Sequence, residues 1–536
     1  MPIHKVPTSP KKSKKPTVAN PKTKPVLTTS QQLGSLIKSA RTIMRKDKGL
    51  NGDMDRLPML TWVMFLKFLD DLENLHEQKA SLAGKSYKPV IQSPYRWRDW
   101  AAKEDGITGD DLKHFINDQE EAVRPDGTKG NGLFEQLRQL RGVNGGKDQR
   151  DVIACIFKGV VNRMESGFLL REVINRVNGI HFSSSEEIHT LSHLYESMLK
   201  EMRDAAGDSG EFYTPRPLVR FMVEVTNPRL GETVLDPACG TGGFLVEAFS
   251  YLSAQAKTVK DRRVLLEESI FGGEAKPLPF LLSQMNLLLH GVESPQIDPR
   301  NSLLVPLRDI GDKDRVDIVL TNPPFGGEEE KGIQGNFPDD KQTAETALLF
   351  LMLIMRKLRR TPKPGRAGVV VPNGILFGDG VCARIKEELL KDFNLHTIVR
   401  LPNGVFSPYT SIPANLLFFD RSGPTKEIWY YEQPLPEGRK SYSKTLPLQY
   451  EEFADCIKWW NNRTENDQAW KVSVDQVLMY DNEKRLLSVN LDTKNPNAKT
   501  DFEHLSPEVL LDGVIDKEKK ILNVLAEIKA SLAVTV

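Results

Sequence analysis

The sequence predicts an α/β protein in which a helical region precedes a domain built on a parallel sheet. Between about residues 30 and 185, apolar residues recur at every third or fourth position, which is the spacing of one helix face. Between about residues 186 and 420, short β-rich runs alternate with helical stretches, the pattern of strands joined by crossover helices. The chain has 536 residues, enough for about three or four folded units.

Composition excludes several classes of protein. Lys and Arg number 73 and Asp and Glu number 72, so the net charge of +1 argues against a broad basic face that holds nucleic acid unaided. No run approaches the ~18 apolar residues that a membrane span needs. The four cysteines are far apart, which favours a reducing cytoplasm over a disulfide framework and leaves no zinc-ribbon spacing. They are Cys155, Cys239, Cys382 and Cys456.

Five segments are expected along the chain. Residues 1–28 hold seven Lys, six Pro and no acidic residue, so we expect a disordered basic tail, with a weak nucleic-acid contact as the functional alternative. A helical N-terminal domain covers 30–185, the sheet domain covers 186–425, and a mixed extension of it covers 426–500. A C-terminal helix covers 501–536, and its heptad-like spacing fits either its own domain or a partner helix.

The helical region contains two strongly periodic runs near its start. One carries Leu33, Ile37, Ala40 and Ile43, and a longer, more apolar one extends over 57–72. A further helical run covers 151–177, after the glycine-rich loop 142–146. No strand is expected in this region.

The sheet domain contains five β-rich runs, and an aromatic-rich stretch follows it. The runs cover 233–235, 317–320, 368–371, 397–401 and 415–419. The stretch 420–500 carries Trp429, Tyr430, Tyr431, Trp459, Trp460 and Trp470.

Three patterns resemble functional motifs without completing them. Residues 83–86 look like the end of a P-loop, but Lys79 replaces its first glycine and a helix precedes it. His189 and His193 lie one helical turn apart without the glutamate of a zinc protease, and Ser184 with Glu187 fits a capping box. Gly240 and Gly242 begin a dinucleotide fingerprint, but Leu245 occupies its third glycine position.

The first motif that predicts chemistry is the run 233–244. An apolar strand ends at Asp236, and a loop with Gly240, Gly242 and Gly243 leads into a helix. Glycines let the backbone pass close to a ligand, and a carboxylate at a strand end suits a cationic amino group. The loop lacks the charge for a pyrophosphate, so it favours S-adenosylmethionine over a dinucleotide.

Glu274 ends the next expected strand, about 38 residues further on. A carboxylate there can accept hydrogen bonds from both ribose hydroxyls, as in dinucleotide-binding folds. Because the usual spacing is ~20 residues, we expect an extra helical insertion near 250–268.

The second motif is the run 317–325, in which an apolar strand delivers Asn322, Pro323, Pro324 and Phe325 at its carboxyl end. An amino group on an aromatic ring is a poor nucleophile, because its lone pair is delocalised. The side-chain oxygen of Asn322 and the carbonyl of Pro323 can each accept one amino hydrogen and favour a pyramidal nitrogen. Two prolines stiffen the backbone, and Phe325 offers a stacking face. The two motifs together predict an amino-methyltransferase that needs no strong general base.

With these motifs, the sequence resembles the modification (M, HsdM-type) subunit of type I restriction–modification systems, an N6-adenine DNA methyltransferase family. Further similar blocks are 210–220, 276–291, 371–374 and 400–406. The resemblance implies a Rossmann-like S-adenosylmethionine-dependent domain after a helical N-terminal domain and before a subunit-docking helix. It also implies a cytoplasmic location in a bacterium or archaeon.

The resemblance assigns residues to the cofactor site and the base pocket. The implied cofactor residues are Glu211, Phe212, Tyr213, Thr214, Pro215, Arg216, Asp236, Gly240, Thr241, Gly242, Gly243 and Glu274. Asn301 falls where many amino-methyltransferases carry an acidic contact to the cofactor adenine. Phe406 is expected to help hold the everted base, and no metal ligands are expected.

The resemblance also implies partners. Double-stranded DNA is the substrate, a specificity (S) subunit selects the site, and two M chains close around the duplex. A separate restriction (R) subunit would translocate and cut DNA, since this chain has no intact P-loop. Two alternatives stay open: a solitary methyltransferase of DNA, RNA or a protein glutamine amide, with 420–500 as its recognition domain, and a non-catalytic scaffold.

Overall fold

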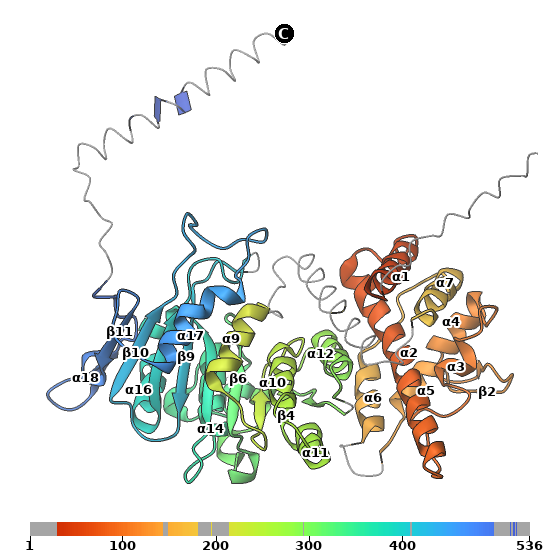
Figure 1. Cartoon of the computed structure of the whole chain (residues 1–536), viewed down its shortest axis with the longest axis horizontal. Coiled ribbons are helices and arrows are strands. Elements are labelled where there is room, and N and C mark those ends of the chain that lie inside the picture. Colours follow the sequence, from red (N-terminus) through yellow and green to blue (C-terminus); the bar gives the residue numbers. More distant parts are fainter. Residues whose placement is uncertain are drawn as a thin grey trace, which may run out of the picture.

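A computed structural model of the chain describes residues 29–142, 148–180, 195, 214–292, 294–407 and 410–497, together with five residues between 515 and 522. The expected basic tail, the pair His189 and His193, and most of the C-terminal helix lie outside the described residues. Figure 1 shows a helical unit, red to orange, beside a sheet-containing unit, yellow to blue.

The N-terminal unit is built around one long helix. This helix, α2 (Asp53–Leu82), has 30 residues, and its central part is buried as the apolar spacing predicted. Around it lie α1 (Thr29–Met44), α3 (Trp97–Trp100), α4 (Gly109–Asn117), α5 (Leu133–Arg138), α6 (Gln149–Lys158) and α7 (Gly167–Asn178).

Two details of the helical unit differ from the sequence prediction. The single run expected over 151–177 is two helices, because Gly159 ends α6 and the Ser166 side chain caps α7 by accepting from Leu169 N. A small antiparallel pair, β1 (Ala122–Val123) and β2 (Lys129–Gly130), also interrupts the helices. Strands of two residues are too short to show an alternating pattern.

The second unit contains a nine-stranded sheet in the order β11-β10-β8-β9-β7-β6-β3-β4-β5. The strands are β3 (Val234–Asp236), β4 (Ile270–Gly273), β5 (Gln296–Asp298), β6 (Ile318–Thr321), β7 (Arg366–Pro372), β8 (Asn394–Arg400), β9 (Ala414–Asp420), β10 (Glu427–Glu432) and β11 (Ala469–Ser473). All five expected β-rich runs are strands of this sheet. The expected boundary near residue 425 falls inside the sheet, because β10 and β11 extend it.

The sheet is mixed, so the expectation of a purely parallel sheet is wrong. β9 runs antiparallel to both β7 and β8, and β11 runs antiparallel to β10. A parallel neighbour needs a crossover connection, usually a helix. The described residues between β8 and β9 form no helix, so the chain returns in the opposite direction.

Helices cover both faces of the sheet. Along β6, Ile318 and Leu320 join the core formed with α10 and α12, whereas Val319 joins the core formed with α14 and α16. The insertion expected near 250–268 is confirmed as α11. The main helices are α9 (Arg216–Thr226), α10 (Gly243–Ser253), α11 (Val259–Glu268), α12 (Pro277–Leu289), α14 (Thr346–Lys357) and α16 (Val381–Asp392). Smaller elements are α13 (Lys331–Gln334), α15 (Gly374–Phe377), α17 (Ala454–Asn461), α18 (Val474–Val477), β12 (Leu478–Tyr480) and β13 (Leu486–Val489).

The two units share a packed interface at α12. This helix contacts α2 and α6 of the helical unit. One continuous apolar core runs from the helical unit into the sheet unit. Among the helices of the described part, none is long and apolar enough to cross a membrane.

Candidate active site

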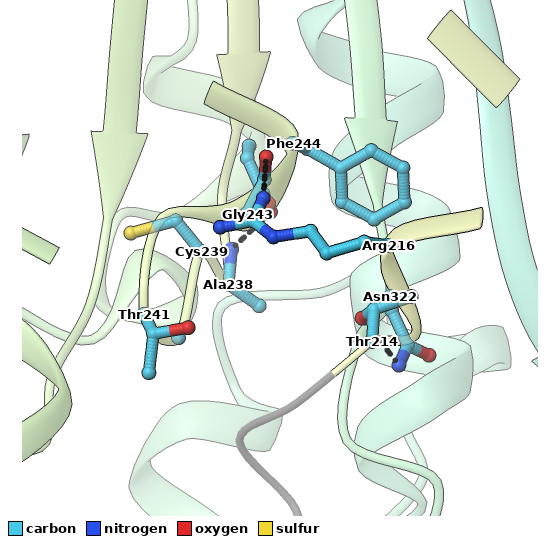
Figure 2. A pocket seen from close by; sticks show the side chains of 10 residues that line it. Thr214, Arg216, Ala238, Cys239, Thr241, Gly243, Phe244 and Asn322 are labelled. Carbon is cyan, nitrogen blue, oxygen red and sulfur yellow. Dashed lines mark hydrogen bonds between the residues drawn. The ribbon is translucent and has the colours of Figure 1, made fainter. Parts of the chain in front are cut away.

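A cleft lies at the carboxyl ends of β3 and β6, where open α/β sheets bind ligands. The space between its walls, part of which is open to solvent, is about 370 Å³, and Figure 2 shows the side chains that line it. The lining residues are Thr214, Arg216, Asp236, Ala238, Cys239, Gly240, Thr241, Gly243, Phe244 and Asn322. Seven of the residues predicted from the sequence therefore meet in one place, although 108 positions separate Thr214 from Asn322.

Asp236 is a buried carboxylate at the floor of this cleft. Its Oδ1 accepts hydrogen bonds from the Thr321 hydroxyl at 2.6 Å and from Ala238 N at 3.1 Å. Burial raises the pKa of Asp236 to about 7, although these two hydrogen bonds act in the opposite direction. The ionised form of a carboxylate that is so poorly solvated is strongly stabilised by a cationic ligand.

The glycine loop after β3 adopts a backbone conformation that favours glycine at two positions. Gly240 and Gly242 have φ of +53° and +79°, the left-handed region that favours glycine. Gly242 caps α10, and a Cβ added to it would lie 3.3 Å from Cβ of Ser283. The loop is tied to α12, since Asn286 Nδ2 donates to the carbonyl of Thr241 at 2.8 Å.

Glu274 follows β4 and faces the same loop. Its two oxygens accept from Gly240 N at 3.0 Å and from Lys276 N at 2.8 Å. Burial raises the pKa of Glu274, and these two backbone hydrogen bonds oppose the shift. The carboxylate is therefore fixed at the edge of the glycine loop.

Asn322 projects into the cleft from the end of β6. Its Nδ2 donates to the Thr214 hydroxyl at 3.0 Å, as Figure 2 shows. Among the described residues, its Oδ1 has no hydrogen-bond partner, although the atom is buried. A buried acceptor without a partner costs free energy, about 1–3 kcal/mol, unless a ligand donates to it. The arrangement presents an acceptor oxygen to a donor that enters from the cleft.

An aromatic pair stands beyond Asn322. The rings of Phe325 and Phe406 meet edge to face, with centroids 5.7 Å apart. Phe406 belongs to the loop that follows β8, so the tertiary fold joins two motifs that are 81 positions apart in the sequence. The fold therefore brings the two rings together just after the end of β6.

Asn301 lies in a different cleft, whereas Arg216 lines the first one. Asn301 lines a second cleft of about 740 Å³ together with Gly273 and Asp298, and its Oδ1 accepts from Leu303 N at 3.0 Å. Pro215 precedes α9, and the Arg216 side chain donates to the carbonyl of Gly243 at 2.6 Å. Glu211, Phe212 and Tyr213 lie outside the described residues.

Sequence reasoning missed two contributors. Thr321 holds Asp236 through its hydroxyl, and Asn286 holds the glycine loop. Thr321 directly precedes Asn322, so its position at a strand end could have indicated a role in the site. The sequence indicates a role for Asn286 only in that it is a polar residue within an apolar helix. Within the described ranges, no group of three His, Cys, Asp or Glu side chains could hold a metal ion.

Comparisons with known proteins show the family of the chain. The family model of the N-6 DNA Methylase matches residues 186–498, and that of the HsdM N-terminal domain matches residues 33–177. The methylase subunit of the type I restriction enzyme EcoEI from Escherichia coli is 46% identical over 487 residues, which are 89% of this chain and 93% of that protein.

Two solved structures are similar over most of their length. The modification subunit of a putative type I restriction enzyme from Vibrio vulnificus YJ016 is 69% identical with a TM-score of 0.82, covering 89% of this chain and 99% of that one. A chain from a structure of a type I restriction–modification system, described for its complex assembly and conformational transition, is 40% identical with a TM-score of 0.74 and covers 94% of this chain and 99% of that one. The chain therefore belongs to the N-6 DNA methylase family, as a methylase subunit of type I restriction–modification systems and an adenine-specific DNA methyltransferase.

Proposed function

We propose that the chain transfers a methyl group from S-adenosylmethionine to N6 of adenine in DNA, at sites that a separate specificity subunit selects. The observation that carries the proposal is the Oδ1 of Asn322, which is buried and has no hydrogen-bond partner among the described residues. Asn322 lines the same cleft as the buried carboxylate of Asp236. The Asn322 oxygen can accept a hydrogen bond from a ligand, and the Asp236 carboxylate favours a cationic ligand.

The residues of the two clefts fit the parts of S-adenosylmethionine. Asp236 suits the ammonium group, and the left-handed glycines allow close passage of the amino-acid portion. Glu274 is linked to both clefts. Its carboxylate accepts a hydrogen bond from Gly240, which lines the first cleft, and it directly follows Gly273, which lines the second. Its carboxylate suits the ribose hydroxyls, and Asn301 in the larger cleft suits the adenine.

Asn322 would prepare the attacking nitrogen. Its Oδ1 and the Pro323 carbonyl each accept one hydrogen of the adenine amino group, which turns the nitrogen lone pair out of the ring. The cofactor supplies a methyl group on a positively charged sulfur. Because a neutral amine attacks a cationic donor, positioning supplies most of the rate, and the product proton passes to solvent.

The aromatic pair would hold the target base. A base inside a duplex cannot reach Asn322, so the adenine must leave the stack at a cost of a few kcal/mol. Phe325 and Phe406 offer ring surfaces on which the extruded base stacks. Contacts of the chain and its partners with the duplex offset the rest of the cost.

The fold disfavours a solitary enzyme that carries its own recognition domain. The aromatic-rich stretch 420–500 was its only candidate, but β10 and β11 extend the central sheet. Aromatic rings of this stretch pack in the core, where Tyr430 and Trp470 stack with ring centroids 5.2 Å apart. We therefore propose a complex of two M chains with one S subunit on DNA, joined by an R subunit in the restricting enzyme.

The test is radiolabelled methyl transfer from S-adenosylmethionine to unmodified plasmid DNA, followed by nucleoside analysis. The chain is assayed alone and with the specificity subunit encoded beside it. We expect N6-methyladenine only when both are present. Strong methylation by the chain alone would favour a solitary enzyme, and cofactor binding without transfer in either case would contradict the proposal.

A further inference from the structure

The positive charge of this chain is concentrated near its start. Residues 1–48 carry twelve Lys and Arg and a single acidic residue, Asp47, which gives this stretch a net charge of +11 in a chain whose total is +1. The remaining residues, 49–536, are therefore acidic on balance. In the part of the stretch that the structure describes, the cations lie on α1 and on the turn that follows it, residues 45–50.

One face of α1 is buried and another face carries cations. The buried residues are Ile37, Ala40, Ile43 and Met44. Lys38 and Arg45 are both exposed. Arg45 continues the helix, since its N–H donates to the Arg41 carbonyl at 3.1 Å. Because Lys38 and Arg45 are seven positions apart, their side chains leave the same face of the helix, about 10 Å from each other along its axis.

Lys46 and Lys48 are exposed on the turn after α1, and Asp47 between them fixes that turn. The Asp47 carboxylate is buried and accepts three backbone hydrogen bonds. The donors are the N–H groups of Gly49, Glu165 and Ser166, at 2.9, 3.1 and 3.0 Å. The one acidic side chain of the stretch therefore anchors the turn to the start of α7, and the two lysines are held on a fixed backbone.

Four cations of this surface have no partner among the described residues. They are Lys38, Arg45, Lys46 and Lys48, here called the basic ridge, whose charged groups form neither a hydrogen bond nor an ion pair there. Arg41 is not one of them, because it lies 3.3 Å from Asp53. No large apolar side chain is exposed on the described part of α1 or on the turn, whereas the centre of a protein interface is apolar. The basic ridge therefore suits a polyanion better than a protein partner.

The basic ridge lies on the same side of the molecule as the candidate active site. The loop after β10 leaves the sheet at the edge where Asn322 lies, because β6, β7, β8 and β10 all point the same way. In Figure 1 the blue loops at the upper end of the sheet unit mark that edge, and α1 lies at the upper end of the neighbouring helical unit. One long polyanion can therefore contact both.

We propose that the basic ridge binds backbone phosphates of the DNA that flanks the methylation site. This inference rests on the proposed function, because it takes DNA as the substrate. Ammonium and guanidinium groups without partners neutralise phosphates without reading sequence, and the counterions that are released supply the free energy. Such a local contact gives a chain of net charge +1 a hold on the duplex without a broad basic face.

The test measures DNA binding by the complex of this chain with its specificity subunit. A fluorescein-labelled 40-base-pair duplex of arbitrary sequence is titrated by anisotropy at several KCl concentrations. The two ridge variants are Lys38→Gln/Arg45→Gln and Lys46→Gln/Lys48→Gln. For each we expect weaker binding, and the slope of log K against log [KCl] should be shallower by about 1–2. Glutamine has a helix propensity close to that of Lys and Arg, so α1 should keep its fold.

The matched control is Lys257→Gln/Lys260→Gln. It removes the same charge from two exposed lysines around the start of α11, at the lower end of the sheet unit in Figure 1. Its slope should match that of the wild type, because the duplex would not reach it. A slope that falls equally in the control and in the ridge variants would overturn the inference, since any lost charge would then have the same effect.

The other outcomes separate this inference from the proposed function. Ridge variants with the wild-type slope overturn the inference, and so does a ridge variant that no longer copurifies with the specificity subunit, because the ridge would then bind protein. Neither readout uses methyl transfer. A wild-type complex that forms no N6-methyladenine would instead overturn the proposed function, while a shallower slope in the ridge variants would still support the phosphate contact.

Discussion

Asn322 is the residue on which transfer should depend most directly, because its Oδ1 is the buried acceptor without a partner among the described residues. We expect Asn322→Ala to lower the transfer rate by about 10²–10³-fold, the usual effect of removing one preorganised polar contact to a reacting group. Cofactor affinity, measured by calorimetry, should hardly change, because Asp236 and Glu274 remain. Equal activity of the variant and the wild type would contradict the mechanism.

Thr214 should act through Asn322, because its hydroxyl accepts from Nδ2 and so fixes the orientation of the Asn322 amide. Thr214→Val removes that partner at nearly the same volume. We expect kcat to fall about 5–10-fold, the equivalent of one hydrogen bond. Thr214→Ser keeps the hydroxyl and should restore kcat. A rate that is equal in the valine and serine variants would show that the contact is only structural.

Asp236 predicts a pH dependence of cofactor binding. Its pKa is raised to about 7, so the carboxyl group is largely protonated below pH 7 and ionised above it. Only the ionised form attracts the ammonium group, and affinity for S-adenosylmethionine should therefore rise with pH, by about 25-fold between pH 5.5 and 7.5. Isothermal titration across this range measures it. A flat profile would show that Asp236 does not pair with the cofactor ammonium.

At the scale of elements, the turn from β3 into α10 must keep its backbone conformation for the cofactor to bind. Gly242→Asp places a side chain at φ +79°, close to Ser283 of α12, and adds a charge beside the cleft. Gly231→Asp is the matched control, since Gly231 has φ +90° with nothing within 4 Å of an added Cβ.

Both variants should lose about 1–2 kcal/mol of stability from the left-handed conformation. Only Gly242→Asp should lose cofactor binding, which a thermal-shift assay with S-adenosylmethionine detects. Retained binding in Gly242→Asp would show that the loop does not approach the cofactor.

At the scale of the whole molecule, the helical unit packs against the sheet unit through α12. Gly159 at the end of α6 lies against Pro277 at the start of α12, and a Cβ on Gly159 would be 2.8 Å from the Pro277 Cβ. Gly159→Ala should therefore loosen the interface and destabilise the chain by about 1–3 kcal/mol, the usual cost of overpacking.

Gly332→Ala in α13 serves as the comparison, because nothing lies within 4 Å of its added Cβ. Differential scanning calorimetry should show a lower Tm, or two transitions, for Gly159→Ala only. The same profile for both variants would mean that the α6–α12 contact does not hold the units together.

The sequence alone determined the elements whose signals are local. The periodic run over 57–72 is α2, and the runs before Asp236 and Asn322 are β3 and β6, because burial on a helix face or a strand leaves a spacing that a short window records. The chemistry that we propose for both motifs is argued from their own residues.

Only the tertiary structure decided what depends on partners distant in the chain. Four features each join segments that no local pattern links. They are the antiparallel β9, the Thr214–Asn322 hydrogen bond, the Phe325–Phe406 contact and the close approach of the Tyr442 backbone to Gly404. Such contacts form because a folded chain must satisfy its buried polar groups and fill its core, and their partners are chosen by the whole packing. The sequence by itself therefore determined which reaction we propose for this protein. The tertiary fold decided how the side chains of the site are positioned relative to one another.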